Sequence, residues 1–296
     1  IFVKYKHFKQ ALLFKVGSGM NFLFWNVEKK PTCYDVIIDV VEDNNIDVIA
    51  IAEFPVGIDE ARTFLNKLRK KDSNFELLQA VAREKVLVFF NKTNAIVKNQ
   101  YNEGKIAIKK ITTKNSKVNA YVAFCHLESK VNINDDEQAE RVTKLKETLC
   151  SFENDIDDKD GFLLLCGDLN MNPFEKGLIK ANGLNAVMDS SIAKKKNRKV
   201  QGQSYKFFYN PMWGFLGDLG KGNVSGTYYF NSSNHIQYFW NVFDQVLLRP
   251  EAIPYFDKEA LDILTSTTHY NLLKKSGAID DKQYSDYLPI IFKLNI

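Results

Sequence analysis

One stretch of the chain, residues 161–172, constrains the fold more than any other part of the sequence. It reads GFLLLCGDLNMN, so five consecutive apolar residues run into a glycine, an acid and an amide. A run this short between two glycines fits a buried strand better than a helix, and α/β proteins place their chemistry at the ends of such strands. Asp168 and Asn170 lie two residues apart, so their side chains project from the same side of an extended backbone. The alternative is a loop in which both residues serve only the backbone of a turn.

The composition narrows the class of protein without naming a function. The 296 residues suffice for one large α/β or sandwich domain or for two small ones, and the sequence contains no obvious linker. Its apolar runs are far shorter than the roughly 20 residues of a membrane span. The net charge of +4 permits a polyanionic partner without requiring one. The four cysteines have no CxxC spacing, and Cys125 and Cys166 lie in apolar runs, which predicts buried thiols and a reducing cytoplasm.

Residues 1–19 differ from the rest of the chain. They read IFVKYKHFKQALLFKVGSG, with no initial Met and a flexible Gly-Ser-Gly immediately before Met20. Lysines interrupt the apolar residues, which argues against a secretory signal. We therefore predict an appended segment, foreign to the natural chain, over 1–19 and a single domain over 20–296. The alternative is a native amphipathic helix at the N-terminus.

Hydrophobic periodicity predicts the order of elements from Met20 onward. Strands are expected at residues 20–27, 46–53, 75–80, 86–91, 95–110 with a turn at 102–104, 118–126, 242–248 and 288–295. Helices are expected at residues 33–45, 59–71, 135–152 and 260–273, together with a short helix that Pro173 opens and Gly183 caps.

Two segments outside these elements could contact a substrate. Residues 194–199 read KKKNRK; they are either a solvated surface loop or a contact for a phosphate backbone. The second interpretation assigns substrate binding to Lys194, Lys195, Lys196 and Arg198. Residues 205–240 are rich in aromatics, glycine and asparagine, which predicts an ordered loop over a site. Trp213 in this loop could stack on a base.

Polar residues terminate or interrupt the predicted strands at Asn26, Glu53, His126, Asp168, Asn170, Asp244 and Asp286. In their order along the chain they fall in six motifs, which are Trp25-Asn26, Glu53, His126-Leu127, Gly167-Asp168-Leu169-Asn170, Asp244 and Ser285-Asp286. This series resembles the endonuclease/exonuclease/phosphatase superfamily, over residues 20–296. The resemblance implies a four-layer α/β/β/α sandwich of two mostly antiparallel sheets flanked by helices. It also implies phosphodiester or phosphomonoester hydrolysis at one edge of that sandwich.

The resemblance carries expectations for a metal ion. Glu53, with Asn26 beside it and Asp286 near, would bind Mg²⁺ or Mn²⁺, since hard cations prefer oxygen ligands. Glu28 falls where relatives sometimes carry a second acidic ligand, although it could equally be an exposed loop glutamate.

The resemblance also assigns the chemical steps. Asp168 would orient and deprotonate the attacking water, while Asn170 and His126 hold phosphate oxygens in the transition state. The alternative for His126 is a core histidine with no catalytic role.

The last motif departs from the superfamily. Relatives have Ser-Asp-His, whose histidine contacts the scissile phosphate while an acid, Asp244 here, orients it. This chain has Ser285-Asp286-Tyr287, and a tyrosine with a free pKa of about 10 stays neutral near pH 7. Either a histidine has been replaced to silence this chain, or the protein is a naturally weakened or non-catalytic member.

The leading hypothesis is therefore a cytoplasmic, metal-dependent phosphoesterase, specifically a nuclease acting on nucleic acid and weakened at Tyr287. A phosphatase or phosphodiesterase of inositol phosphates or lipid head groups is the alternative enzyme, although a Pro-Trp-Thr-Asp-Arg type motif is missing from the sequence. A non-catalytic binding module that keeps the fold is the alternative from a different class.

Overall fold

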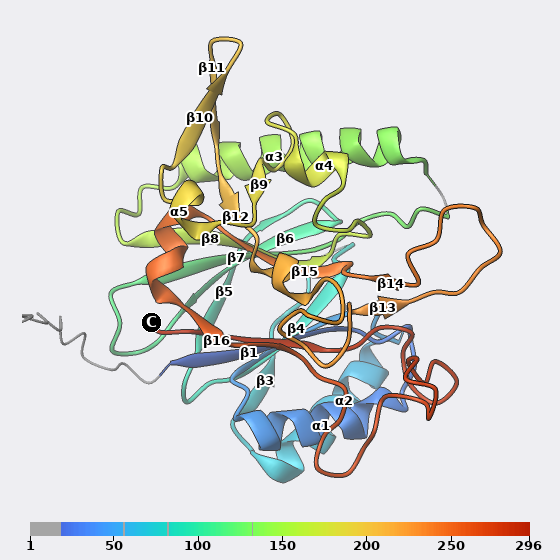
Figure 1. Ribbon diagram of the computed structural model, residues 1–296. Coiled ribbons are helices and arrows are strands. Elements are labelled where there is room, and N and C mark those ends of the chain that lie inside the picture. The colour runs from blue at the N-terminus through green and yellow to red at the C-terminus, as the bar shows by residue number, and fades with distance from the viewer. Residues whose placement is uncertain (1–18, 56, 82, 132) are drawn as a thin grey trace, which may run out of the picture.

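The computed structural model describes residues 19–55, 57–81, 83–131 and 133–296, so the predicted appended segment lies outside the described residues except for Gly19. Two sheets pack against each other, and helices cover their outer faces (Figure 1). The predicted four-layer sandwich is confirmed.

The six-stranded sheet contains, in spatial order, β16 (Phe256–Ile263), β17 (Ile290–Leu294), β1 (Met20–Asn26), β2 (Val48–Ala52), β4 (Val86–Asn91) and β3 (Phe75–Leu77). The seven-stranded sheet contains β5 (Ile96–Asn102), β6 (Ile106–Thr112), β7 (Asn119–His126), β8 (Gly161–Asp168), β15 (Asp244–Leu248), β12 (Phe208–Tyr209) and β9 (Ala186–Val187). Two small hairpins pair β10 (Asn197–Val200) with β11 (Gln203–Lys206), and β13 (Tyr228–Tyr229) with β14 (Trp240–Asn241).

Helices α1 (Cys33–Asn44) and α2 (Ile58–Lys71) cover one side of the sandwich, and α3 (Asp135–Asp155) and α4 (Lys176–Ile179) cover the other (Figure 1). The remaining helical segments are α5 (Ser190–Ala193) and the 3₁₀ helices η1 (Pro211–Phe215) and η2 (Pro250–Tyr255). Helix α3, which the sequence predicted over residues 135–152, begins with a capping box, in which the Asn134 side chain accepts from the Glu137 amide and the Glu137 side chain accepts from the Asn134 amide.

Strand β8 is buried on both faces, as its continuous apolar run predicted. Phe162, Leu164 and Cys166 belong to the core that both sheets share. The alternate residues Leu163 and Leu165 pack into a second core beneath α3. This period of two follows from strand geometry, and it places Asp168 at the buried end of a central strand.

Strand direction decides where polar strand ends meet. Within the two large sheets, β1 pairs in parallel with β2, β7 with β8, and β12 with β9, while the other neighbours are antiparallel. The sheets are therefore mostly antiparallel, as predicted. The two parallel pairs at the centre bring the carboxyl ends of β1 and β2, and of β7 and β8, to common edges.

The helix predicted over residues 260–273 is wrong. Residues 256–263 form edge strand β16, which pairs with β17 through a register shift between Asp257 and Asp262. The segment then turns back on itself through a bridge between Ser266 and Asn271. Local periodicity was misleading here because pairing with β17 supplies hydrogen bonds that an isolated segment lacks.

The short helix after Pro173 is also shorter than predicted. It covers only Lys176–Ile179, and its C-cap is Lys180 rather than Gly183. A Cβ at Gly183 would lie 2.1 Å from the carbonyl oxygen of Gly177, so the glycine permits close packing of two backbone segments.

Cys33, Cys125 and Cys166 are buried free thiols, and burial raises the pKa of Cys33 to about 12. The prediction of buried thiols at Cys125 and Cys166 is confirmed. Among the described residues, no helix combines the length and apolar character needed to cross a membrane.

Candidate active site

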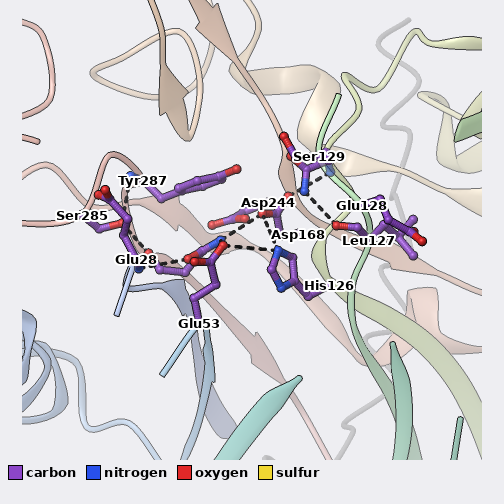
Figure 2. Close-up of polar contacts among 12 residues, drawn as sticks. Glu28, Glu53, His126, Leu127, Glu128, Ser129, Asp168, Asp244, Ser285 and Tyr287 are labelled. Atoms are coloured by element: carbon purple, nitrogen blue, oxygen red, sulfur yellow. Dashed lines mark hydrogen bonds and ion pairs between the residues drawn. The ribbon is translucent and has the colours of Figure 1, made fainter. Parts of the chain in front are cut away.

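The candidate active site lies where polar strand ends of the two sheets face each other (Figure 2). Parallel register places Asn26 at the end of β1 beside Ala52, and Glu53 follows Ala52 directly. Parallel register also places His126 beside Asp168 at the ends of β7 and β8, and antiparallel register places Asp244 on the other side of Asp168. His126, Asp168 and Asp244 therefore occupy adjacent positions on three neighbouring strands.

Asn26 links the two sheets at this point. Its Nδ2 lies 3.0 Å from Asp168 Oδ2 and 3.3 Å from Glu53 Oε1. His126 Nε2 lies 3.5 Å from the same Glu53 oxygen and 3.7 Å from the same Asp168 oxygen. The carboxylates of Glu53 and Asp168 thus converge on one amide and one imidazole, well within the separation of about 10 Å that one shared cation site allows.

The last motif is tied to strand β1. Ser285 Oγ donates to the Asn26 carbonyl at 2.6 Å and accepts from the Tyr287 amide at 3.1 Å. Trp25 Nε1 donates to the Tyr287 carbonyl at 2.9 Å. These bonds hold residue 287 through backbone atoms, so its position depends little on the side chain that it carries.

Gly167 allows β7 and β8 to approach closely just before the site. A Cβ at this position would lie 2.0 Å from the carbonyl oxygen of Cys125, its partner in the parallel register. We expect Gly167→Ala to lower the free energy of unfolding by about 3 kcal/mol, because two buried strands would have to separate. Urea denaturation would measure this change. Gly214→Ala is the matched control, since a Cβ there meets nothing within 4 Å; an equal loss in both variants would contradict the explanation.

Four of the ten non-glycine residues with a positive φ in the described part of the chain lie at or next to the site. Glu28, Lys29, Glu53 and Asn170 have φ angles of 48°, 55°, 48° and 50°. Non-glycine residues rarely adopt this conformation, and such strain is characteristic of functional sites.

Comparison with solved structures identifies the fold. A D. rerio TDP2 complexed with single-strand DNA product has 14% identity and a TM-score of 0.55, covering 94% of this chain and 100% of that chain. An endonuclease/exonuclease/phosphatase family protein from Bacteroides thetaiotaomicron has 11% identity and a TM-score of 0.57, with 94% and 98% covered. The chain has the endonuclease/exonuclease/phosphatase fold. An AP endonuclease from Archaeoglobus fulgidus has 10% identity and a TM-score of 0.54, with 94% and 100% covered.

No protein-family model matches the chain, and a search of curated proteins returns no match. The solved structures thus confirm the fold that the resemblance implied, at low sequence identity. The identities of 10–14% establish the fold, and the roles of the site residues stay predictions.

Asp168 is more deeply placed than the sequence indicated. Its side chain is 0% exposed, whereas Glu53 and His126 are 30% and 19% exposed. Burial raises the pKa of Asp168, and this effect is opposed by the charge of His126 and by hydrogen bonds from the Asn170 amide and the side chains of Asn26 and Tyr287. In this endonuclease/exonuclease/phosphatase fold, Asp168 is therefore a buried carboxyl group held by four neighbours, with no direct solvent exposure.

Asp244 is the least satisfied group of the site. It is fully buried, and neither carboxyl oxygen has a hydrogen-bond partner within the described chain. Burial, then the charges of Asp168 and Asp286, raise its pKa well above the ordinary value. The Tyr287 ring extends toward Asp244 without bonding to it (Figure 2).

We expect Asp244→Asn to stabilise the protein by about 2 kcal/mol near pH 8, because an isolated buried carboxyl group is costly. The sign follows from the raised pKa. The unfolded chain loses this proton above about pH 4 while the folded chain keeps it, so stability falls as pH rises. The Asp244→Asn variant has no carboxyl group at this position, so it lacks this loss of stability at high pH. Chemical denaturation at about pH 5 and about pH 8 should show a gain that grows with pH; a gain that shrinks with pH would contradict this account.

The residues present fit a hard divalent cation, although no three His, Cys, Asp or Glu side chains in the described ranges already form a metal centre. Asp286 Oδ1 is buried without a hydrogen-bond partner in the described part of the chain. Burial, then the charge of Glu28, raise the pKa of Asp286 to about 7, and Glu53 adds to the effect. A cation among these oxygens would relieve both the burial cost and the repulsion.

Two of the predicted metal ligands are already engaged. Glu28 Oε2 accepts from Lys30 Nζ at 2.7 Å and from the Asp286 amide at 3.2 Å. The Asn26 side-chain oxygen accepts from the Glu28 amide at 3.1 Å. One carboxylate oxygen of Glu28 is thus engaged, while the side chain is 41% exposed. The assignment of Glu28, like those of Glu53, Asn26 and Asp286, stays a prediction.

Asn170 lies within the site but bonds to the protein. Its Nδ2 donates to the Leu127 carbonyl at 3.0 Å, and its own carbonyl accepts from Gln138 at 2.8 Å. These bonds tie the segment after β8 to the end of β7 and to α3. Gln138 is a contributor that the sequence analysis missed, because nothing in its helix marked it.

The basic run is not at the site, which corrects one of our expectations. Lys196 and Asn197 line a cavity with Gly161 and Phe162, the first residues of β8, whereas Asp168 is the last. An eight-residue strand separates them by roughly 20 Å. Lys194, Lys195, Lys196 and Arg198 lie at or before the hairpin of β10 and β11, which projects from the body of the protein (Figure 1).

Trp213 lies nearer to the site. Its ring is 6.4 Å from that of Phe174, which belongs to the segment leaving β8. The aromatic segment also supplies two residues that the sequence analysis missed. Thr227 Oγ1 accepts from the Asp244 amide at 3.1 Å, and the Tyr228 ring lies 4.7 Å from the Tyr287 ring. Both residues belong to the aromatic-rich segment 205–240, for which the sequence predicted an ordered loop over a site.

Proposed function

We propose that this chain is a divalent-metal-dependent phosphoesterase and, more specifically, a nuclease that hydrolyses phosphodiester bonds. The observation that carries the proposal is the gathering of Asn26, Glu53, His126 and Asp168 at one edge of the sandwich. Paired acids beside an imidazole and an amide combine a base with groups that can hold phosphate oxygens.

The side chains divide the work as follows. Asp168, held by Asn26 and the Asn170 amide, accepts a proton from the attacking water, and burial raises its pKa above the ordinary value, which makes it a stronger base. His126 presents Nε2 to the same space, where it can donate to a phosphate oxygen. Mg²⁺ or Mn²⁺ held by Glu53 and Asp286 would supply positive charge to the phosphate and the leaving oxygen.

Nucleic acid is the substrate class that the solved relatives favour. The D. rerio TDP2 structure contains a single-strand DNA product, and the Archaeoglobus fulgidus relative is an AP endonuclease. We infer a polymeric phosphodiester for this chain from that likeness and from the aromatic residues near the site. A phosphatase or phosphodiesterase of inositol phosphates or lipid head groups would use the same groups on a smaller substrate.

Tyr287 is the observation that favours a second function, a non-catalytic binding module. Burial, then the charges of Asp168 and Asp244, raise the pKa of Tyr287 well above its usual value, so the side chain stays neutral. A neutral phenol cannot supply positive charge to a phosphate.

A hydrolysis panel tests the proposal. Single- and double-stranded DNA, RNA, a generic phosphodiester, an inositol phosphate and a lipid phosphodiester are incubated with the chain and with the Tyr287→His variant, in Mg²⁺, Mn²⁺ and a chelator. Metal-dependent cleavage of the nucleic acids supports the nuclease. Preferred cleavage of a small phosphoester supports the alternative enzyme, and no cleavage by a folded variant supports the binding module.

A further inference from the structure

The residues around the site follow a spatial order that both sheets share. In the seven-stranded sheet, Lys105 precedes β6, His126 ends β7, Asp168 ends β8 and Asp244 starts β15. In the six-stranded sheet, the strands that run in the same spatial direction are β4, β2, β1 and β17. Lys85 directly precedes β4, the first strand of this series. Lys85 and Lys105 therefore lie at one end of the row of acids, and Tyr228, Tyr287 and the hairpin of β13 and β14 lie at the other.

The basic end consists of Lys85, Lys105 and Arg141. Lys105 forms an ion pair with Glu128, and Arg141 Nε lies 3.8 Å from the same carboxylate. The Lys105 carbonyl accepts from the His126 amide at 3.1 Å, which fixes this cluster beside the site.

The basic end has surplus positive charge. Burial and then the charges of Arg141 and Lys85 lower the pKa of Lys105, which shows that both cations lie close enough to repel the Lys105 ammonium. Of the nearby acids, Glu84 pairs with Lys109, whereas Glu103 accepts only from the uncharged hydroxyls of Tyr101 and Thr148 and keeps its negative charge. Glu103 and Glu128 together cannot neutralise three cations.

The aromatic end is built around Phe174. Its ring lies 5.4 Å from Tyr238 and 6.4 Å from Trp213, both at edge-on angles. The segment is anchored to the site, because Asn172 Nδ2 donates to Asn241 Oδ1 at 2.9 Å. Tyr238 is 56% exposed, and residues 228–241 contain no Lys, Arg, Asp or Glu, so this end offers ring faces without charge.

We propose that a single-stranded nucleic acid lies along this row, with backbone phosphates on Lys85, Lys105 and Arg141 and bases stacked on Phe174 and Tyr238. The proposal rests on the proposed function, which supplies the hydrolysis of the phosphodiester bond lying at the acids between these two ends. It extends that function by naming the substrate class. Cations hold phosphates of any sequence, and aromatic rings stack only on bases that are not covered by a paired strand. Four neighbouring strand positions span roughly 15 Å, enough for a few nucleotides.

A membrane surface is the competing occupant, because Leu219 and Ile236 are also exposed. Peripheral membrane binding usually joins apolar residues to cations on the same face, where anionic lipids add attraction. Here Lys85, Lys105 and Arg141 lie across the acids from the aromatic hairpin. That separation favours a polymer with phosphates at one end and bases at the other.

The test measures binding without turnover. Fluorescence anisotropy of a labelled oligothymidylate of about 16 nucleotides is recorded over a salt series in Mg²⁺, with gels showing that it stays uncut. The triple variant Lys85→Gln, Lys105→Gln and Arg141→Gln keeps donors for Glu128, so it should fold. We expect its slope of log affinity against log salt to be flatter by about 2, at about 0.7 for each phosphate contact.

Two further variants locate the strand. The matched control neutralises Lys194, Lys195 and Arg198, and it should leave the salt slope unchanged because these residues lie at the other end of β8. Tyr238→Ala should weaken binding of the single strand by about tenfold, as the loss of one stacked base would, with little effect on a duplex or on the salt slope.

Three results would overturn the proposal. These are an unchanged slope in the first triple variant, equal affinity for duplex and single strand, or tighter association with phosphatidylserine vesicles than with the oligonucleotide. Hydrolysis is measured separately. A chain that binds as expected while its Tyr287→His variant cleaves nothing contradicts the proposed function alone, and cleavage without this binding pattern contradicts the strand path alone.

Discussion

Replacing Tyr287 with histidine is expected to raise the rate of phosphodiester hydrolysis by about 10² to 10⁴. The imidazole would lie beside Asp244, whose two carboxyl oxygens lack hydrogen-bond partners in the described chain. A carboxylate beside an imidazole raises the pKa of the imidazole, so the charged form that binds phosphate persists to higher pH. The same contact supplies Asp244 with the partner that it lacks.

The fold can accept this change. Residue 287 is held by its backbone, through Trp25 and Ser285, and an imidazole is smaller than the phenol that packs against Tyr228. Tyr287→Phe is the matched control, because it keeps the ring packing and provides no proton. Steady-state kinetics with Mg²⁺ and Mn²⁺ would measure the gain.

The pH profile adds a readout that packing alone would not change. Activity of the Tyr287→His variant should fall at high pH as the imidazolium loses its proton. If Tyr287→His and Tyr287→Phe were equally active, or if a folded Tyr287→His variant cleaved no substrate in the panel, the catalytic role of this position would be excluded.

The general fold could be read from the sequence because the signal was repeated along the chain. A polar residue at the end of an apolar run is weak by itself, yet Asn26, Glu53, His126 and Asp168 occur in one order in one chain. The parallel pairs β1–β2 and β7–β8 explain why these ends meet. The topology of the sheets decides which strand ends lie together, so the order of the motifs along the chain was enough to predict which polar residues share the site.

Long-range pairing could not be read in the same way. The segment 260–273 has helical periodicity, but edge strand β16 forms because β17, some thirty residues later, offers hydrogen bonds. The position of Lys194–Lys199 depends on the hairpin of β10 and β11 packing near the start of β8 rather than its end. No local feature of the sequence shows whether this hairpin packs near the start or near the end of β8.

Burial and pairing within the site were likewise hidden. Glu28 is neutralised by Lys30 two residues away, but the Lys30 ammonium is also held by the carbonyls of Asp281 and Tyr284 from the far end of the chain. The order of motifs places residues near one another. It does not assign the hydrogen bonds that decide which carboxylate stays open to a cation.

Asp168→Asn is expected to abolish the activity of the Tyr287→His variant, lowering the rate by about 10² to 10⁴, because an amide cannot accept the proton of water. The asparagine substitution is preferable to alanine, since Asp168 is fully buried and accepts bonds from Asn26 and Asn170. Alanine would leave these donors unpaired at a cost of about 1–3 kcal/mol each. An asparagine keeps an oxygen for at least one of them.

The stability of the Asp168→Asn variant separates catalysis from packing. Removing one of two buried carboxyl groups in adjacent positions of the β8–β15 pair removes their mutual repulsion. We therefore expect a free energy of unfolding equal to or above that of the parent at neutral pH, together with loss of hydrolysis. Asp262→Asn, a half-buried carboxyl group on β16 away from the site, is the matched control and should keep full activity. Retained hydrolysis in Asp168→Asn, or loss of activity that tracks a lower melting temperature, would remove Asp168 from the proposed chemistry and leave it a structural acid at the end of β8.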